Sequence, residues 1–187
     1  MVRNTIKQPF TIILCGLSGS GKSTLGKGVY DFLIKKNIGT ELMDADVYRK
    51  ILSPNEPFDE PTRDLFRKKL FFIAKLLNRN NICAVIPMIC SNSKIRNFAR
   101  NEIKNLYEIY LKTSLDECIR RNTKGHYTKV NGKFKKNLIG IDIPFIEPIR
   151  NNLTVDCEKN DKNKSLEIIL ESLVKDIDII NEAVNYD

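Results

Sequence analysis

Short apolar runs recur along the chain and are separated by longer segments in which apolar residues have a helical spacing. In the first helical segment Leu25, Val29, Phe32 and Leu33 repeat every three or four residues, as on one face of an α-helix. The pattern predicts strands at 10–16, 40–44, 82–88, 106–112 and 153–156, and helices at 23–36, 62–80, 93–103, 114–122 and 164–184. This alternation predicts an α/β fold of three layers, with a mainly parallel five-stranded sheet and helices on both faces.

The segment GLSGSGKST, residues 16–24, lies between the first predicted strand and the first predicted helix. It fits the phosphate-binding pattern GxxxxGK[ST], and its strand–loop–helix context is the one that this P-loop requires. We expect Lys22 to contact the β- and γ-phosphates of ATP and Ser23 to bind Mg²⁺. The alternative is a glycine-rich turn without a ligand. The other predicted ATP contacts in the segment are Gly16, Ser18, Gly19, Ser20, Gly21 and Thr24.

Two aspartates, Asp44 and Asp46, follow the second predicted strand. Ligands of parallel α/β sheets gather at the carboxyl ends of the strands, so both carboxylates are expected near the γ-phosphate. Phosphoryl transfer to a hydroxyl needs a group that orients or deprotonates the hydroxyl, and anionic groups that hold Mg²⁺ and its water. We therefore predict a catalytic and metal-binding role for Asp44. The alternative is an Asx turn that only closes the strand.

The regular pattern breaks at residues 123–150, which have no clear period and are rich in lysine, glycine and proline. A long irregular segment inside a compact domain is typically functional or disordered. Beside an ATP site, the functional interpretation is a mobile lid that excludes water as it closes. No internal repeat or linker marks a second domain, so we expect residues 1–187 to form a single kinase domain.

Charge and composition narrow the possible partners. Lysine and arginine exceed aspartate and glutamate by 31 − 23 = 8, a balance that suits an anionic ligand. We find no basic and aromatic stripe and no zinc-finger or RNP motif, so we expect a small phosphorylated substrate and no nucleic acid. The chain contains no run of about 18 apolar residues, so no membrane span is expected. Five scattered cysteines without a CxxC pair favour buried thiols and a cytoplasmic location over disulfides or zinc.

Taken together, the motifs resemble those of the adenylylsulfate (APS) kinase family. The resemblance runs from residue 10 to about 175. It is carried by GLSGSGKST, a D-x-D-x-x-R motif from Asp44, an F-x-x-x-x-R motif from Phe58, a K-G-x-Y motif from Lys124 and the later G-I-D-x-P. It implies a P-loop kinase that uses ATP and Mg²⁺ to phosphorylate the ribose 3′-hydroxyl of APS. Because members of the family are commonly dimers, it also implies a homodimer.

The resemblance also assigns roles to single residues. Asp44 matches the catalytic aspartate, which is associated with Mg²⁺, and Asp46 matches the second acid of that motif. Arg121 matches an arginine near the adenine of ATP. The residues expected to bind the acceptor nucleotide, or to line its site at positions where the family has other residues, are Asp46, Arg49, Phe58, Arg63, Phe66, Ile89, Lys124 and Leu138.

Within this set, Arg49 and Arg63 match two arginines that hold the acceptor, and Phe58 matches an aromatic residue that stacks on its base. Lys124 opens the lid and Tyr127 matches its tyrosine. His126, the only histidine of the chain, stands where the family usually has leucine. We interpret it as a surface or hinge residue and not as a catalytic base.

The departures from the family cluster on the acceptor side. After Arg63 the family usually reads E-N-I-R-R, whereas residues 65–69 of this chain read L-F-R-K-K, with Phe66 in place of an acceptor-binding asparagine. The family's I-S-P-Y-R becomes I-C-S-N-S at 89–93. Leu138 replaces a second aromatic residue that completes the sandwich around adenine. Since stacking on an aromatic ring contributes about 1–3 kcal/mol per base, these changes predict a different preference for the base.

Several functions are compatible with these departures. A smaller pyrimidine with an uncharged phosphoramidate terminus would suit them, and some relatives of APS kinase phosphorylate cytidine diphosphoramidate in capsule biosynthesis. The alternative is a divergent APS kinase of sulfate assimilation in which Phe134 or Phe145 supplies the missing ring. A regulatory ATP-binding module without transferase activity is a third possibility, and intact Lys22, Ser23 and Asp44 argue against it. The spacing of the acceptor residues disfavours a shikimate- or gluconate-type kinase.

Overall fold

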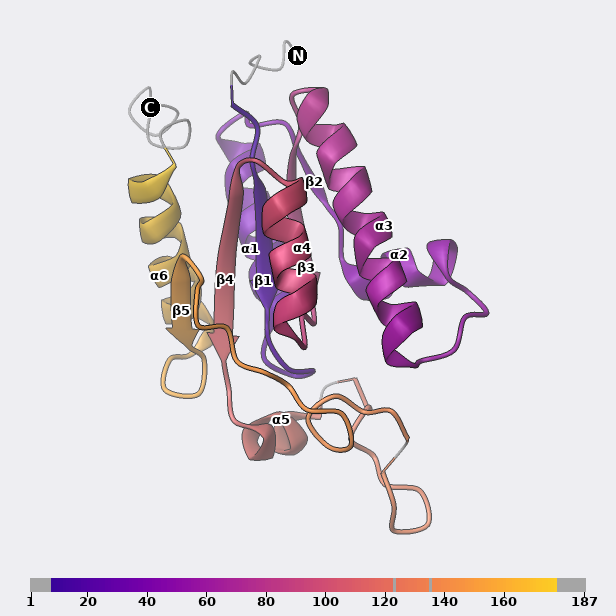
Figure 1. Cartoon of the computed structure of the whole chain (residues 1–187). Coiled ribbons are helices and arrows are strands. Elements are labelled where there is room, and N and C mark those ends of the chain that lie inside the picture. The colour runs from indigo at the N-terminus through magenta and orange to yellow at the C-terminus, as the bar shows by residue number, and fades with distance from the viewer. Residues whose placement is uncertain (1–7, 123, 135, 178–187) are drawn as a thin grey trace.

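Five parallel strands form the centre of the protein in a computed structural model, which describes residues 8–122, 124–134 and 136–177 (Figure 1). Their order across the sheet is β2-β3-β1-β4-β5, and every neighbouring pair is parallel. The sheet confirms the fold predicted from the sequence. The strands are β1 (Thr11–Cys15), β2 (Thr40–Leu42), β3 (Cys83–Met88), β4 (Leu106–Lys112) and β5 (Leu153–Asp156).

Helices cover both faces of the sheet, because successive side chains of the buried strand β1 point to opposite faces. Ile12 and Leu14 pack against apolar residues of α1 (Lys22–Lys35) and α6 (Lys162–Asp176). Ile13 and Cys15 pack against residues of α3 (Glu60–Arg79) and α4 (Ser93–Glu102) on the other face. The sheet and the helices packed on its two faces therefore form the three layers that the pattern predicts (Figure 1).

One helix was not expected from the sequence. Helix α2 (Ala45–Leu52) follows β2 directly, and it buries none of its residues. Its apolar residues Val47 and Ile51 are exposed, whereas Ala45, Tyr48 and Leu52 are half-buried against the core, so the helix contributes only a short and shallow apolar stripe. The other predicted helices differ from the observed ones by a few residues at their ends, while residues 178–184 of the last prediction lie outside the described part.

The long segment after α5 (Leu115–Arg121) is irregular, as predicted. Its described residues between 124 and 150 contain only isolated bridges and turns, and no helix or strand. Tyr127 and Ile139 are buried in a small apolar cluster with Leu17 and Cys118, which anchors the segment beside the P-loop. The segment lies at the carboxyl ends of the strands, at the bottom of Figure 1. Its opening and closing as a lid stays a prediction.

All five cysteines are buried free thiols, as the sequence indicated. Within the described residues no helix combines the length and the apolar character that crossing a membrane requires.

Adjacent phenylalanines of α3 test the register of this helix on the sheet. Phe71 is completely buried, whereas Phe72 is 61% exposed. Phe71→Ala should lower the free energy of unfolding by about 3–5 kcal/mol, because it leaves a cavity in the core. The matched control Phe72→Ala should change it by about 0.5 kcal/mol or less. Urea denaturation measures both, and equal losses would contradict the packing described here.

Candidate active site

The P-loop joins the end of β1 to the start of α1 in a conformation that requires glycine. Gly19 and Gly21 have φ values of +84° and +97°, where side chains are strained. Gly16 faces a different constraint, since a Cβ atom there would lie 2.6 Å from Ser20 Oγ and 2.8 Å from the carbonyl oxygen of Leu111. The predicted strand–loop–helix arrangement is therefore confirmed, and the glycines set its shape.

Lys22, the first residue of α1, holds its ammonium group over this loop. Its Nζ donates a hydrogen bond of 2.5 Å to the carbonyl oxygen of Leu17. Burial, against the opposing effect of Cys15 and together with the nearby Lys124 ammonium, lowers the pKa of Lys22 to about 8. A poorly solvated cation next to a turn of backbone N–H groups is well suited to bind phosphate oxygens.

A small cavity of about 80 Å³ opens in front of the loop, and we call it the P-loop cavity. The predicted ATP and metal residues among its lining are Ser18, Gly19, Gly21, Lys22, Ser23, Thr24 and Asp44. Asp44 Oδ1 also accepts a hydrogen bond of 2.9 Å from the backbone N–H of Asp46, and it thereby caps α2. Asp44 therefore closes the turn before α2, and its catalytic role stays a prediction.

Three predicted ATP residues do not line the P-loop cavity. Gly16 and Ser20 are buried residues of the loop itself, and Ser20 is fully buried. Arg121, at the end of α5, donates hydrogen bonds to Glu117 Oε1 at 2.7 Å and to the carbonyl oxygen of Cys157 at 2.6 Å. The guanidinium is therefore tied to the segment after β5, and its role near adenine remains a prediction.

Lys124, in the irregular segment after α5, contacts residues on two walls of the P-loop cavity. Its Nζ donates to Ser23 Oγ at 3.0 Å and to Asp46 Oδ2 at 2.5 Å. Although desolvation raises the pKa of the Asp46 carboxyl, the hydrogen bond and charge of Lys124 lower it below its ordinary value. A cation is thus accommodated between a hydroxyl and a carboxylate. Among the described residues no three His, Cys, Asp or Glu side chains cluster in a way that could hold a metal ion.

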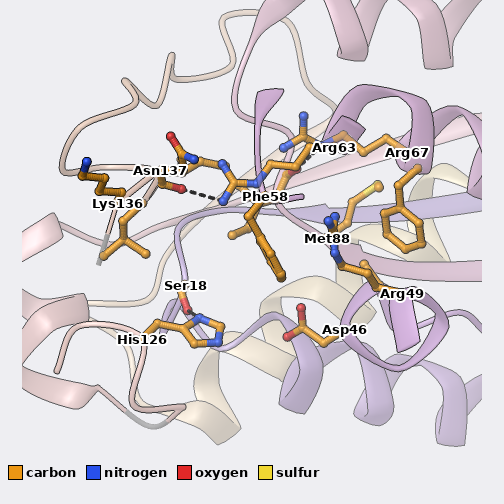
Figure 2. Close-up of a pocket in the computed structure, with 15 residues that line it drawn as sticks. Ser18, Asp46, Arg49, Phe58, Arg63, Arg67, Met88, His126, Lys136 and Asn137 are labelled. Atoms are coloured by element: carbon orange, nitrogen blue, oxygen red, sulfur yellow. Dashed lines mark hydrogen bonds between the residues drawn. The ribbon is translucent and has the colours of Figure 1, made fainter. Parts of the chain in front are cut away.

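A second cavity of about 450 Å³ adjoins the first and is called the arginine cavity here. The two cavities are adjacent and share six lining residues: Ser18, Ala45, Asp46, Met88, Ile89 and His126. In Figure 2, Asp46, Ser18 and His126 lie on one side, and Arg63 and Arg67 lie on the opposite side. The predicted acceptor residues among its lining are Asp46, Arg49, Phe58, Arg63, Phe66, Ile89 and Leu138. Lys124 lines only the P-loop cavity.

An exposed aromatic ring separates two guanidinium groups in the arginine cavity. The guanidinium carbon of Arg49 lies 4.0 Å from the centroid of Phe58, and that of Arg63 lies 5.5 Å from it. Arg49 Nη2 also donates to the carbonyl oxygen of Pro57 at 3.0 Å, and Arg63 Nη2 donates to that of Asn137 at 2.6 Å. These contacts hold two cations within range of cation–π attraction while leaving them at the cavity wall.

The aromatic residues offered as substitutes for the missing ring lie elsewhere. Phe145 stacks on Tyr110 with centroids 6.0 Å apart, and Phe134 lies under the Lys129 ammonium. Neither lines the arginine cavity, whereas Leu138 does. The cavity thus keeps the exposed Phe58 ring and the buried Phe66 ring, but an aliphatic side chain stands at the position of the second stacking residue.

The sequence did not predict that Arg67 and His126 line the site. Arg67 was noted only as part of a departure from the family, yet it lines the arginine cavity together with Lys136 and Asn137. His126 is exposed, as expected for a surface residue, but its Nδ1 lies 2.9 Å from Ser18 Oγ and it lines both cavities. Its place inside the K-G-x-Y motif was the signal available for such a position.

A P-loop at the carboxyl ends of the strands of a five-stranded parallel sheet, with a charged cavity beside it, defines a P-loop kinase that acts on a small acceptor. The chain belongs to the adenylylsulphate kinase family, whose model matches residues 8–156. Members of this family are phosphotransferases with an alcohol acceptor that use ATP and Mg²⁺. The predictions of fold, enzyme class and cofactors are therefore confirmed.

Relatives with two different names resemble the chain to similar degrees. It is 33% identical over 161 residues to a probable adenylyl-sulfate kinase of Pyrococcus abyssi, which covers 86% of this chain and 92% of the relative. It is 34% identical over 166 residues to a cytidine diphosphoramidate kinase of Campylobacter jejuni, covering 88% and 96%. An APS kinase of Mycobacterium tuberculosis, solved with AMPPNP and APS, is 28% identical with a TM-score of 0.80, covering 89% and 98%.

The two roles of Asp44 can be separated by substitution. Asparagine is as good an N-cap as aspartate, so Asp44→Asn should keep α2 and the melting temperature while removing the charge. We expect kcat to fall about 100-fold or more, with ATP binding retained. Asp44→Ala, the control that also removes the cap, should cost about 1 kcal/mol of stability in addition. An Asn variant that turns over normally would leave only the capping role.

The low pKa of Lys22 predicts that ATP binding takes up a proton. Phosphate oxygens stabilise the charged ammonium and raise its pKa, so the bound form is protonated at a pH where the free form is not. At pH 8 about half a proton should be taken up, and at pH 7 much less. Calorimetric titration of MgATP in buffers of different ionisation enthalpy measures this uptake. Lys22→Arg should abolish it, and uptake that persists in this variant would assign the proton to another group.

Proposed function

We propose that the protein is a MgATP-dependent kinase that transfers the γ-phosphate to the ribose 3′-hydroxyl of a nucleotide with a 5′-diphosphate-like group, and that this nucleotide is cytidine diphosphoramidate. The observation that carries the proposal is that the two cavities adjoin and share lining residues. Phosphate-binding groups line one end, arginines line the other, and Asp46 lines both. An acceptor with a hydroxyl near one end and an anionic group at the other fits this arrangement.

In the proposed reaction each residue has a distinct part. Lys22 binds the β- and γ-phosphates, and Asp44 orients the 3′-hydroxyl and accepts its proton or passes it to water. The hydroxyl oxygen forms a bond to the γ-phosphorus while the bond to the bridging β-oxygen breaks, so that ADP leaves. Ser23 and Asp44 would hold Mg²⁺, which when bound would neutralise charge on the phosphates. The segment 123–150 acts as a lid that excludes water.

The choice of a cytidine acceptor rests on the walls of the arginine cavity. Leu138 supports a base less well than a second aromatic ring would, and this loss affects a large purine more than a pyrimidine. The relative in Campylobacter jejuni, a cytidine diphosphoramidate kinase, supports the same acceptor. A place in capsule biosynthesis would follow from this substrate.

APS is the second candidate acceptor, and the relatives in Pyrococcus abyssi and Mycobacterium tuberculosis favour it. In that case the product is PAPS and the process is sulfate assimilation. A regulatory ATP-binding module is less well supported, because Lys22, Ser23, Asp44 and Asp46 all line the P-loop cavity. We further propose that residues 1–187 are a single kinase domain that works in the cytoplasm as a homodimer, as the family resemblance implies.

A panel of acceptors tests the proposed function. With MgATP, we expect kcat/KM for cytidine diphosphoramidate to equal or exceed that for APS, and both to exceed those for CDP and simple nucleosides. Lys22→Ala, the control for the P-loop, should lower every rate by orders of magnitude. A strong preference for APS would restore the second candidate. Activity confined to a sugar or shikimate-like alcohol would exclude both nucleotides, and no transfer at all would favour the regulatory module.

A further inference from the structure

Arg67 is a third guanidinium in the arginine cavity, at a position where the resembled family has isoleucine in E-N-I-R-R. It lies four residues after Arg63 on α3, so the two side chains share one face of the helix. Figure 2 shows them together on the side of the cavity that faces away from Asp46 and His126. A buried arginine at a position where the resembled family has an apolar residue requires a physical explanation, because desolvation of its charge is costly.

Fixed contacts hold Arg67 in one orientation. Its Nε donates to the carbonyl oxygen of Ile89 at 2.9 Å, and its Nη1 lies 2.6 Å from Asp64 Oδ1 and 3.5 Å from Glu60 Oε1. The side chain is only 5% exposed, so the orientation does not depend on solvent. Among the described residues no hydrogen-bond partner contacts its Nη2, which is left available to the cavity that Arg67 lines.

Arg63 adds a second unused donor. Its Nη1 is buried and has no hydrogen-bond partner within the described part of the chain. Burial lowers the pKa of Arg63 below its ordinary value, and the nearby charge of Arg67 lowers it further. An anion between the two guanidiniums would satisfy the unused donors and relieve the repulsion. Guanidinium groups are well suited to this, because their planar forks match the oxygens of phosphate and sulfate groups.

We propose that Arg67, acting with Arg63, binds the 5′-diphosphate-like group of the acceptor and is a specificity-determining residue of this chain. The proposal deepens the proposed function and rests on it. The Nη2 of Arg67 and the Nη1 of Arg63 donate hydrogen bonds to oxygens of that group. The Ile89 and Asp64 contacts keep the fork in place before the acceptor arrives. Nucleosides without the 5′ group gain nothing from Arg67.

The chain contains a matched control for a buried arginine. Arg67 and Arg96 are both 4% exposed, and both donate to a backbone carbonyl just after β3, that of Ile89 or Cys90. Arg96 lines neither cavity. Replacement of either one by methionine removes a buried guanidinium from the same region, but only Arg67→Met removes a donor from the arginine cavity.

The experiment measures CDP and cytidine binding to the full chain by calorimetry, with MgAMPPNP saturating the ATP site. We expect Arg67→Met to weaken CDP binding about 10- to 100-fold and to change cytidine binding less than twofold. Arg96→Met should leave both affinities within twofold of the original values. Arg67→Lys, which keeps a cation beside Asp64 and preserves folding, should still weaken CDP binding because lysine cannot present a second nitrogen to the cavity. Melting temperatures check that each variant is folded.

Other outcomes overturn the proposal. Equal losses of CDP affinity in Arg67→Met and Arg96→Met would assign Arg67 a structural role, as would equal losses for CDP and cytidine. If cytidine binds too weakly to measure, the comparison of the two variants with CDP decides, and a chain that binds no CDP at millimolar concentration contradicts the proposal outright. If binding depends on Arg67 but no acceptor is phosphorylated, the proposed function fails alone. Phosphorylation with unchanged kcat/KM in Arg67→Met leaves the function standing and rejects the role of Arg67.

Discussion

The parallel direction of the five strands is the constraint on which the site depends. Because all strands end at one edge, the P-loop after β1, the aspartates after β2 and the segment after β3 meet there. Six cationic side chains line the cavities there, namely Lys22, Arg49, Arg63, Arg67, Lys124 and Lys136. Such a concentration of partly desolvated positive charge favours ligands that carry several negative charges, as nucleotides do.

Protein groups contact several of these cations. Lys22 donates to the carbonyl oxygen of Leu17, Lys124 contacts Ser23 and Asp46, and Arg63 donates to the carbonyl oxygen of Asn137. Each contact satisfies a charged donor that would otherwise be costly to bury. Ligand binding can then exchange a neutral or exposed partner for a phosphate oxygen. Each such exchange would form a charge-assisted hydrogen bond.

Local sequence rules predicted the fold and the P-loop because both depend on nearest neighbours. Apolar runs such as residues 106–112 match β4 in full, and the glycines of residues 16–21 have the backbone roles that the motif predicts. Helix α2 was missed because it is short and none of its residues is fully buried, and its cap Asp44 was predicted as a catalytic residue, with an Asx turn as the alternative. The contacts of Arg121 with Glu117 and Cys157 and the access of Arg67 to the cavity depend on tertiary packing. Spacing along the chain does not encode such packing.

The change from isoleucine to Arg67 and the change from an aromatic residue to Leu138 differ in their power to select an acceptor. Removing one stacking face alters affinity gradually, because every base keeps an apolar surface that can contact leucine. A fixed guanidinium with unused N–H groups is more demanding, since an acceptor that lacks matching oxygens leaves a buried donor unpaired. In the proposed acceptor site, the aliphatic wall would therefore change the preference among bases gradually, whereas the arginines would require the anionic group. Recognition of the 5′ group and preference for the base would then be two separate properties of one cavity.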